Sequence, residues 1–347
     1  MQLDRKHYLD IVRIFAIFLV LFTHTGEMGN KIYIISNSTI KQFLYCLLDC
    51  FRTINNPLLF MVSGALLLGK TENLKTIWRK RILRFIIVLF VFSFISVMYS
   101  YTKSWSDFFI EFSLIEFIKS VIAAPVQVSY WYLYAYISFL IMLPFVRKLA
   151  SIPGNIMFYL IVVLVIVNDV FTLLGYVLGL SSININIGNW LFVPFYPICG
   201  YYFDNNWDKI KNKKLHWGLL GGFSIVGLLT STYLTVKRHA ITGVWDESSI
   251  THFDIIISIF VFVSIKEIAK KLKREKIISL LQKISSTMFG IYLLEFILKD
   301  QTVHIYHICD AYMPRIFACF IWLIITMMLG CVVVAILKKI PLIKKLI

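Results

Sequence analysis

The sequence predicts an all-α polytopic membrane protein with about ten transmembrane helices. Of its 347 residues, 59% are hydrophobic and 16% are charged, and the mean hydropathy is +0.78. Ordinary soluble domains carry charge on about 25% of their residues. Apolar segments of roughly 17–25 residues recur between short charged loops, and this length suits helices that cross a hydrocarbon core about 30 Å thick. The apolar runs do not alternate with polar residues, which excludes a membrane β-barrel.

The predicted spans follow one another along the whole chain, which we expect to form a single integral-membrane domain over residues 1–347. The first resembles a signal peptide only superficially, because Arg13 interrupts its apolar run and no small-residue cleavage site follows. The second contains Asn55, Asn56 and Pro57, which should break the helix and favour a cavity, since irregular backbone in a membrane needs protein or water beside it. The other eight are apolar segments separated by charged loops. The ten spans lie near residues 8–26, 43–68, 82–101, 129–146, 155–175, 188–204, 215–235, 250–267, 285–299 and 315–337.

The basic residues are distributed unevenly about these spans. If the N-terminus is inside, 25 of the 35 Lys and Arg residues fall in internal regions and 8 in external ones. The positive-inside rule then predicts that both termini are cytoplasmic. The net charge of +16 needs no nucleic-acid partner, because such loops reflect topology and contact with anionic membrane lipids.

The first span carries four ionisable residues in an apolar run, namely Asp10, Arg13, His24 and Glu27. On a helix, Arg13 and His24 share one face about 16 Å apart along the axis, because eleven residues make three turns plus about 20°. Asp10 and Glu27 each lie three residues from one of them, within side-chain reach. Ionisable groups inside a span usually mark a pathway or a site. The alternatives are an Arg13 that snorkels to the interface with Asp10, a His24 bonded to a loop, and a Glu27 in the outer loop.

Three more charged residues fall in the outer halves of predicted spans. Asp49 and Arg52 are three residues apart on the second span, where neutralisation of each other explains them most simply. Glu295 lies on the ninth span and can share a layer with His24. The alternative is that Glu295 is a membrane carboxylate paired with Arg52 and not part of a site.

Aromatic and histidine residues near the outer interface have simpler interpretations. Trp131 and Tyr132 are typical of the aromatic belt of membrane proteins, and they can equally stack on a sugar. His304 and His307 lack a further ligand pattern, so no metal site is expected.

Five segments carry a resemblance to a known family. They are "YLD" followed by Arg13 and His24 in an R-x10-H pattern, "PLLFMVSGALLLG" (57–69), "RKRILRF" (79–85), "YWYLYAYISFLIMLPFVRKL" (130–149) and "STMFGIYLLEFIL" (286–298). In this order they resemble the integral-membrane acyltransferase-3 family over nearly the whole chain. The chain departs from the pattern at Ser129 and Tyr130, before Trp131, and at Glu295, where many relatives have histidine. Any role of the histidine that many relatives have at this last position is therefore not transferred to Glu295.

The resemblance implies transfer of an acyl group, usually acetyl from acetyl-CoA, to a hydroxyl of a glycan or lipid-linked sugar, in a bacterial cytoplasmic membrane. Acetyl-CoA is then a co-substrate rather than a bound cofactor. His24 is the expected general base, since histidine titrates near neutral pH, and Glu27 or Glu295 orients it. Trp131 and Tyr132 are the expected acceptor-binding residues. Arginine suits phosphate, so the expected donor-binding residues are Arg13, Arg79, Lys80, Arg81 and Arg84.

The alternative function is a polysaccharide or lipid-linked sugar transporter. In that case Arg13, His24 and Glu295 line a conduit and perform no chemistry. The one-sided basic patch and the lack of clear inverted repeats favour the enzyme.

Overall fold

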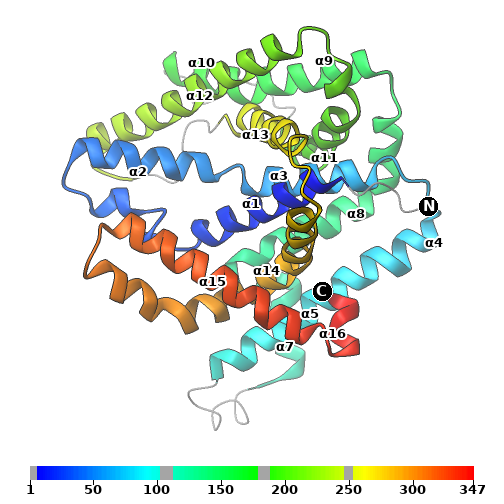
Figure 1. Cartoon of the computed structure of the whole chain (residues 1–347), viewed down its shortest axis with the longest axis vertical. Coiled ribbons are helices and arrows are strands. Elements are labelled where there is room, and N and C mark those ends of the chain that lie inside the picture. The colour runs from blue at the N-terminus through cyan, green and yellow to red at the C-terminus, as the bar shows by residue number, and fades with distance from the viewer. Residues whose placement is uncertain (1–5, 102–111, 179–187, 246–252) are drawn as a thin grey trace.

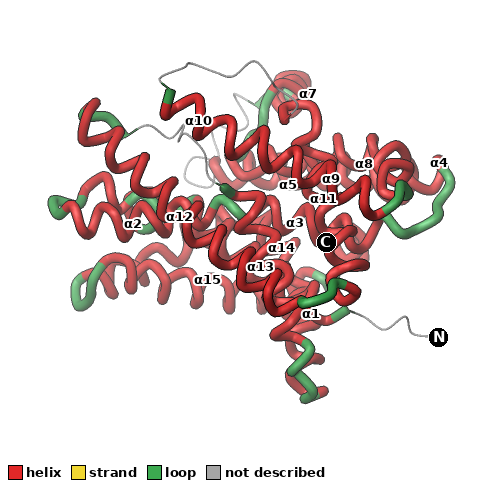
Figure 2. The backbone as a smooth tube through the Cα atoms, turned by 90° about the horizontal axis from the view of Figure 1, so that it is seen from above, coloured by secondary structure: helices red, strands yellow, loops and turns green. Residues whose placement is uncertain are grey.

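The computed structural model describes residues 6–101, 112–178, 188–245 and 253–347, which form helices joined by short loops, with no strand in these ranges (Figures 1 and 2). An all-helical fold was predicted, and this part of the prediction is confirmed. The principal helices are α1 (His7–Thr23), α2 (Thr39–Arg52), α3 (Asn55–Leu67), α4 (Leu74–Thr76), α5 (Leu83–Ser100), α7 (Leu114–Ala123), α8 (Trp131–Ala150), α9 (Gly154–Val165), α10 (Phe171–Val177), α11 (Gly188–Asn206), α12 (Lys213–Thr242), α13 (Asp254–Ala269), α14 (Glu275–Asp310), α15 (Arg315–Leu337) and α16 (Pro341–Leu346).

The ten predicted spans fall in helical regions, but only six helical stretches of the described residues are long and apolar enough to cross a membrane by themselves. The other four predicted spans lie on shorter or more polar helices. α1 has 17 residues and α13 has 16, while Pro194 and Pro197 lie inside α11. The six stretches are Leu74–Ser100, Val128–Ala150, Gly154–Gly175, Lys213–Thr242, Glu275–Asp310 and Arg315–Leu337.

The second predicted span, 43–68, is not one helix but two. α2 ends at Arg52, Thr53 and Ile54 form a turn, and α3 begins at Asn55. The proline at position 57 sits in the first turn of α3, where its missing N–H costs no helical hydrogen bond. The predicted break is therefore confirmed, and it places polar side chains next to the end of α1.

Helix α1 lies at the centre of the fold. It packs against α2, α3, α13, α14 and α15, and Val12, Ala16 and Leu21 are fully buried in these contacts. In Figure 1, α1 begins and α15 ends toward the right of the view, whereas α2 lies at the left. A polar group on α1 is consequently enclosed by protein rather than by lipid.

Helices α3 and α11 approach each other backbone to backbone. A Cβ atom built on Gly64 would lie 1.8 Å from the carbonyl oxygen of Pro197, and one on Gly200 would lie 2.0 Å from that of Met61. Only glycine fits at such a crossing, and small residues are typical of close helix contacts in membranes. This contact fixes α3 beside the core.

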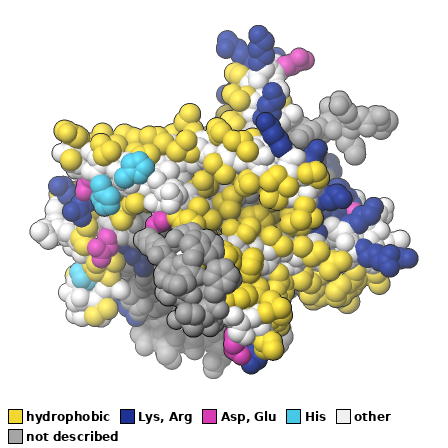
Figure 3. All heavy atoms as spheres, turned by 90° about the horizontal axis from the view of Figure 1, so that it is seen from below, with side chains coloured by type: hydrophobic (Ala, Val, Ile, Leu, Met, Phe, Trp, Pro, Cys, Tyr) yellow, Lys and Arg dark blue, Asp and Glu magenta, His cyan; other side chains and the backbone are white. Residues whose placement is uncertain are grey.

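The surface is consistent with a membrane environment. Figure 3 shows hydrophobic side chains over much of one face, with Lys and Arg side chains gathered mainly toward one end of it. Basic residues concentrated at one end are what the positive-inside rule describes. The cytoplasmic location of that end stays a prediction.

Candidate active site

Helix α1 presents its two functional candidates to two different pockets. Arg13 lines a cavity of about 290 Å³, and His24, one residue past the end of the helix, lines another of about 250 Å³. The eleven-residue spacing predicted a shared helix face, whereas the structure gives each residue its own pocket, with Tyr292 lining both. We refer to the cavities as the arginine pocket and the histidine pocket.

The histidine pocket is polar because the break between α2 and α3 lines it. Thr53, Asn55 and Asn56 from the break face it together with Thr23 and His24. Asn55 is 3% exposed, and its Nδ2 donates to Oγ1 of Thr23 at 2.8 Å. This hydrogen bond ties the start of α3 to the end of α1, so the pocket wall is held beside the histidine.

His24 is paired with Glu295 of α14. Nδ1 of His24 lies 2.8 Å from Oε1 of Glu295, an ion-pair distance, although the ring N–H is not aligned with that oxygen. The glutamate side chain is only 4% exposed, and its Oε2 has no hydrogen-bond donor among the described residues. A buried carboxylate beside one ring nitrogen can orient an imidazole and stabilise its protonated form. Glu27, the other candidate, is exposed on a 3-10 turn, Gly26–Met28.

Arg52 does not pair with Glu295, as the alternative interpretation required. Its Nε donates to Oδ1 of Asp49, three residues earlier on α2. Asn30 and Tyr33 also donate to this carboxylate, at 3.1 and 3.2 Å. The predicted neutralisation of Asp49 and Arg52 is confirmed, while Arg52 also lines the histidine pocket.

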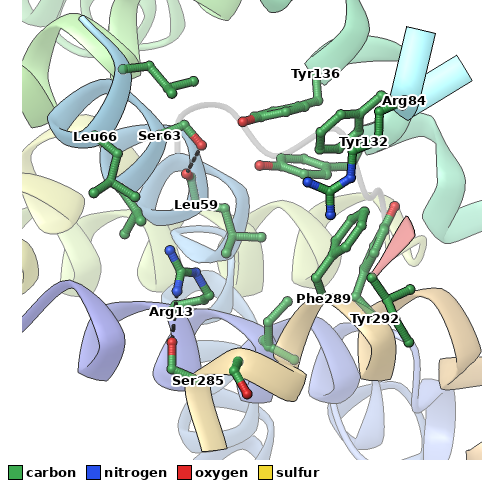
Figure 4. Close-up of a pocket in the computed structure, with 16 residues that line it drawn as sticks. Arg13, Leu59, Ser63, Leu66, Arg84, Tyr132, Tyr136, Ser285, Phe289 and Tyr292 are labelled. Carbon is green, nitrogen blue, oxygen red and sulfur yellow. Dashed lines mark hydrogen bonds between the residues drawn. The ribbon is translucent and has the colours of Figure 1, made fainter. Parts of the chain in front are cut away.

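The arginine pocket contains two guanidinium groups. Arg13 and Arg84 enter it from different helices, α1 and α5 (Figure 4). Nη1 of Arg13 donates to Oγ of Ser285 at 2.8 Å and lies 3.4 Å from Oδ1 of Asp10. Nη2 of Arg84 donates to the carbonyl oxygen of Leu346 at 3.1 Å, and its buried Nε has no acceptor among the described residues. Among the described residues that line this pocket, the two guanidinium groups are accompanied by no Asp or Glu side chain.

The rest of the predicted basic cluster does not line this pocket. Arg79 and Lys80 are exposed on the π-helical turn Ile77–Ile82. Arg81 forms a bidentate pair with Glu72, at 2.6 and 3.0 Å. The sequence analysis grouped Arg79, Lys80 and Arg81 with Arg84 as donor-binding residues. A helix, however, directs neighbouring residues to different sides.

Glu72 binds two arginines beside the loop that follows α3. Besides Arg81, it accepts a hydrogen bond from Arg147 of α8 at 2.8 Å. The hydrogen bond from Arg81, with that from Arg147, lowers the pKa of Glu72 to about 2. This cluster clamps the loop after α3 to α8 and is therefore structural.

Tyr292 lies between the two pockets and lines both of them. Its hydroxyl donates to the carbonyl oxygen of Ser129 at 2.6 Å, and its ring centroid is 5.9 Å from that of Tyr132. Sequence reasoning missed Tyr292, although it lies in a family-like segment three residues before Glu295, on the same side of the helix.

The two acceptor candidates are separated. Trp131 is 38% exposed and lines the histidine pocket, whereas Tyr132 is buried and lines the arginine pocket. The sequence analysis had grouped both as acceptor-binding residues, but successive helical residues point about 100° apart, so the two side chains enter different pockets.

Comparison with known families gives one match. The profile described as an acyltransferase domain, acyltransferase 3, matches residues 6–339. Comparisons with curated proteins and with solved structures found no match.

Proposed function

Because this chain belongs to the acyltransferase-3 family and is a multi-pass membrane acyltransferase, we propose that it moves an acetyl group from acetyl-CoA to a hydroxyl of a glycan or lipid-linked sugar. The observation that carries this proposal is the placement of His24 with Glu295 in one pocket and of Arg13 with Arg84 in the other, on either side of Tyr292. Family membership favours the enzyme over the transporter.

The arginine pocket is the proposed donor site. Arg13 and Arg84 present planar guanidinium groups from two helices, and this group binds phosphate through paired N–H donors. The donor's phosphates enter from the basic, cytoplasmic end, and its slim pantetheine arm lies along α1. Tyr136, Phe289 and Leu66 supply apolar walls for that arm.

In the proposed chemistry, His24 is the general base. Its ring nitrogen Nε2 takes the proton of the acceptor hydroxyl while the hydroxyl oxygen attacks the thioester carbonyl. The new carbon–oxygen bond forms, the carbon–sulfur bond breaks, and the imidazolium returns its proton to the departing CoA thiolate. Glu295 stabilises the imidazolium between these steps. A positioned base of this kind contributes about 10²–10⁴-fold to the rate.

The histidine pocket is the proposed acceptor site. Asn56 and Arg52 offer hydrogen-bond donors, and the half-exposed ring of Trp131 offers a stacking surface for a sugar. The acyl group has to pass Tyr292 to reach the acceptor, so a shift of that ring is part of the proposed route.

The test supplies radiolabelled acetyl-CoA to inside-out membranes and measures label in glycan and lipid-linked sugar. We expect His24→Ala to lose at least a hundredfold in transfer while retaining donor binding, and Arg13→Ala to weaken donor binding. His304→Ala is the matched control, because His304 is exposed. Transfer by His24→Ala at the wild-type rate would disprove the assigned base. Sugar export without any labelled product would disprove the enzyme.

A further inference from the structure

Two residues of helix α14 contact His24, and only one of them, Glu295, belongs to the proposed site. Glu295 approaches the imidazole, and Lys299, one turn later on the same helix, reaches the main chain. Nζ of Lys299 donates to the carbonyl oxygen of His24 at 2.8 Å. The sequence analysis gave Lys299, at the outer end of the ninth predicted span, no role.

The partner of Lys299 is a carbonyl that a helix end leaves unpaired. His24 is the C-cap of α1, and the last carbonyls of a helix lack intrahelical donors and carry partial negative charge. A cation at this position satisfies the orphan oxygen. No residue of α1 itself can do so, because the last turn of the helix has no basic residue.

The groups around Lys299 come from three helices. Glu295 on α14 and Cys319 on α15 lie within electrostatic range of the ammonium group, and His24 of α1 is in contact with it through its main chain. The buried carboxylate and the ammonium are one turn apart, a favourable spacing for opposite charges. The base and its carboxylate therefore sit next to the Lys299 side chain, whose Nζ is held by the hydrogen bond to His24.

We infer that Lys299 is a positioning residue for the proposed reaction, on which this inference rests. By holding the main-chain oxygen of His24, it fixes the end of α1 against α14, so that the imidazole keeps its place beside Glu295.

Two substitutions separate charge from length. Lys299→Met keeps the aliphatic stem and removes the ammonium, and Lys299→Arg keeps a cation and its donors. Lys283→Met is the matched control, since Lys283 is an exposed lysine on the same helix. For Lys299→Met we expect a kcat about 10–100-fold below wild type, with an unchanged KM for acetyl-CoA, because a misplaced group costs this much.

A conservative variant and a double variant test how Lys299 acts. Lys299→Arg should restore most of kcat, because it keeps a cationic donor for the carbonyl oxygen of His24. Combined with Glu295→Gln, Lys299→Met should add little further loss, since both residues act through His24.

The outcomes distinguish this inference from the proposed function. If His24→Ala is inactive while Lys299→Met keeps the wild-type kcat, the inference is wrong and the proposed base stands. An equal loss of kcat in Lys299→Met and Lys299→Arg also overturns the inference, because such a loss describes a packing defect. If His24→Ala is fully active, the proposed base is wrong, and the inference about Lys299 loses its premise.

Discussion

The crossing of α3 and α11 predicts that Gly64→Ala damages stability and activity together. The new methyl carbon would lie 1.8 Å from the carbonyl oxygen of Pro197. Real Cβ atoms essentially never approach closer than 3.0 Å, so the two backbones would have to separate by about 1.2 Å, the difference between these distances. The clashing atom belongs to the main chain, and no side-chain rotation can relieve the contact.

The expected cost follows from this displacement. Forcing an extra carbon into a packed interface costs typically about 1–3 kcal/mol. Asn55 and Ser63 lie on α3, in the histidine and arginine pockets respectively, so a shift of this helix disturbs both sites. We therefore expect a lower unfolding temperature and a lower rate of acyl transfer from the same substitution.

The measurement is thermal unfolding in detergent, read by intrinsic fluorescence, together with the transfer assay. Gly222→Ala on α12 is the matched control, because a Cβ there meets nothing within 4 Å and alanine favours a helix over glycine by up to about 1 kcal/mol. Gly200→Ala should behave like Gly64→Ala. An unfolding temperature of Gly64→Ala no lower than that of wild type would refute the backbone contact.

Three further predictions concern individual polar contacts. Glu295→Gln should lower the transfer rate about a hundredfold and leave donor binding intact, because a neutral amide does not stabilise the imidazolium. The pKa of Glu72, lowered to about 2 by Arg81, implies stability that is complete above about pH 4.5 and lost as the pH falls toward 2, and Glu72→Gln should remove this loss in unfolding measurements. Thr302→Val should destabilise the fold by about 1–3 kcal/mol in detergent, because the buried indole N–H of Trp322 loses its acceptor at 2.9 Å.

Each of these has an outcome that contradicts it. Wild-type transfer by Glu295→Gln would remove the carboxylate from the mechanism. Equal acid sensitivity in wild type and Glu72→Gln would show that the arginine clamp does not act in solution. Unchanged unfolding of Thr302→Val would mean that Trp322 finds another acceptor.

The sequence by itself determined the class of protein and the ingredients of the site. Long continuous apolar runs predict membrane helices, because backbone N–H and C=O groups in lipid must be hydrogen-bonded within the protein and a helix satisfies them within one segment. The eleven-residue spacing of Arg13 and His24 and the break before Asn55 are also local properties, and both reappear in the structure. The family-like segments are local sequence patterns too, and they indicated acyl transfer.

Only the tertiary structure decided which residues meet. Glu295 rather than Glu27 lies beside His24, and Arg84 rather than Arg79 lines the pocket of Arg13, because contacts between helices depend on packing and rotation that no single segment encodes. Apolar periodicity was of little help here, since lipid and protein present equally apolar surroundings to a membrane helix. The direction that each side chain faces is therefore set by its neighbours.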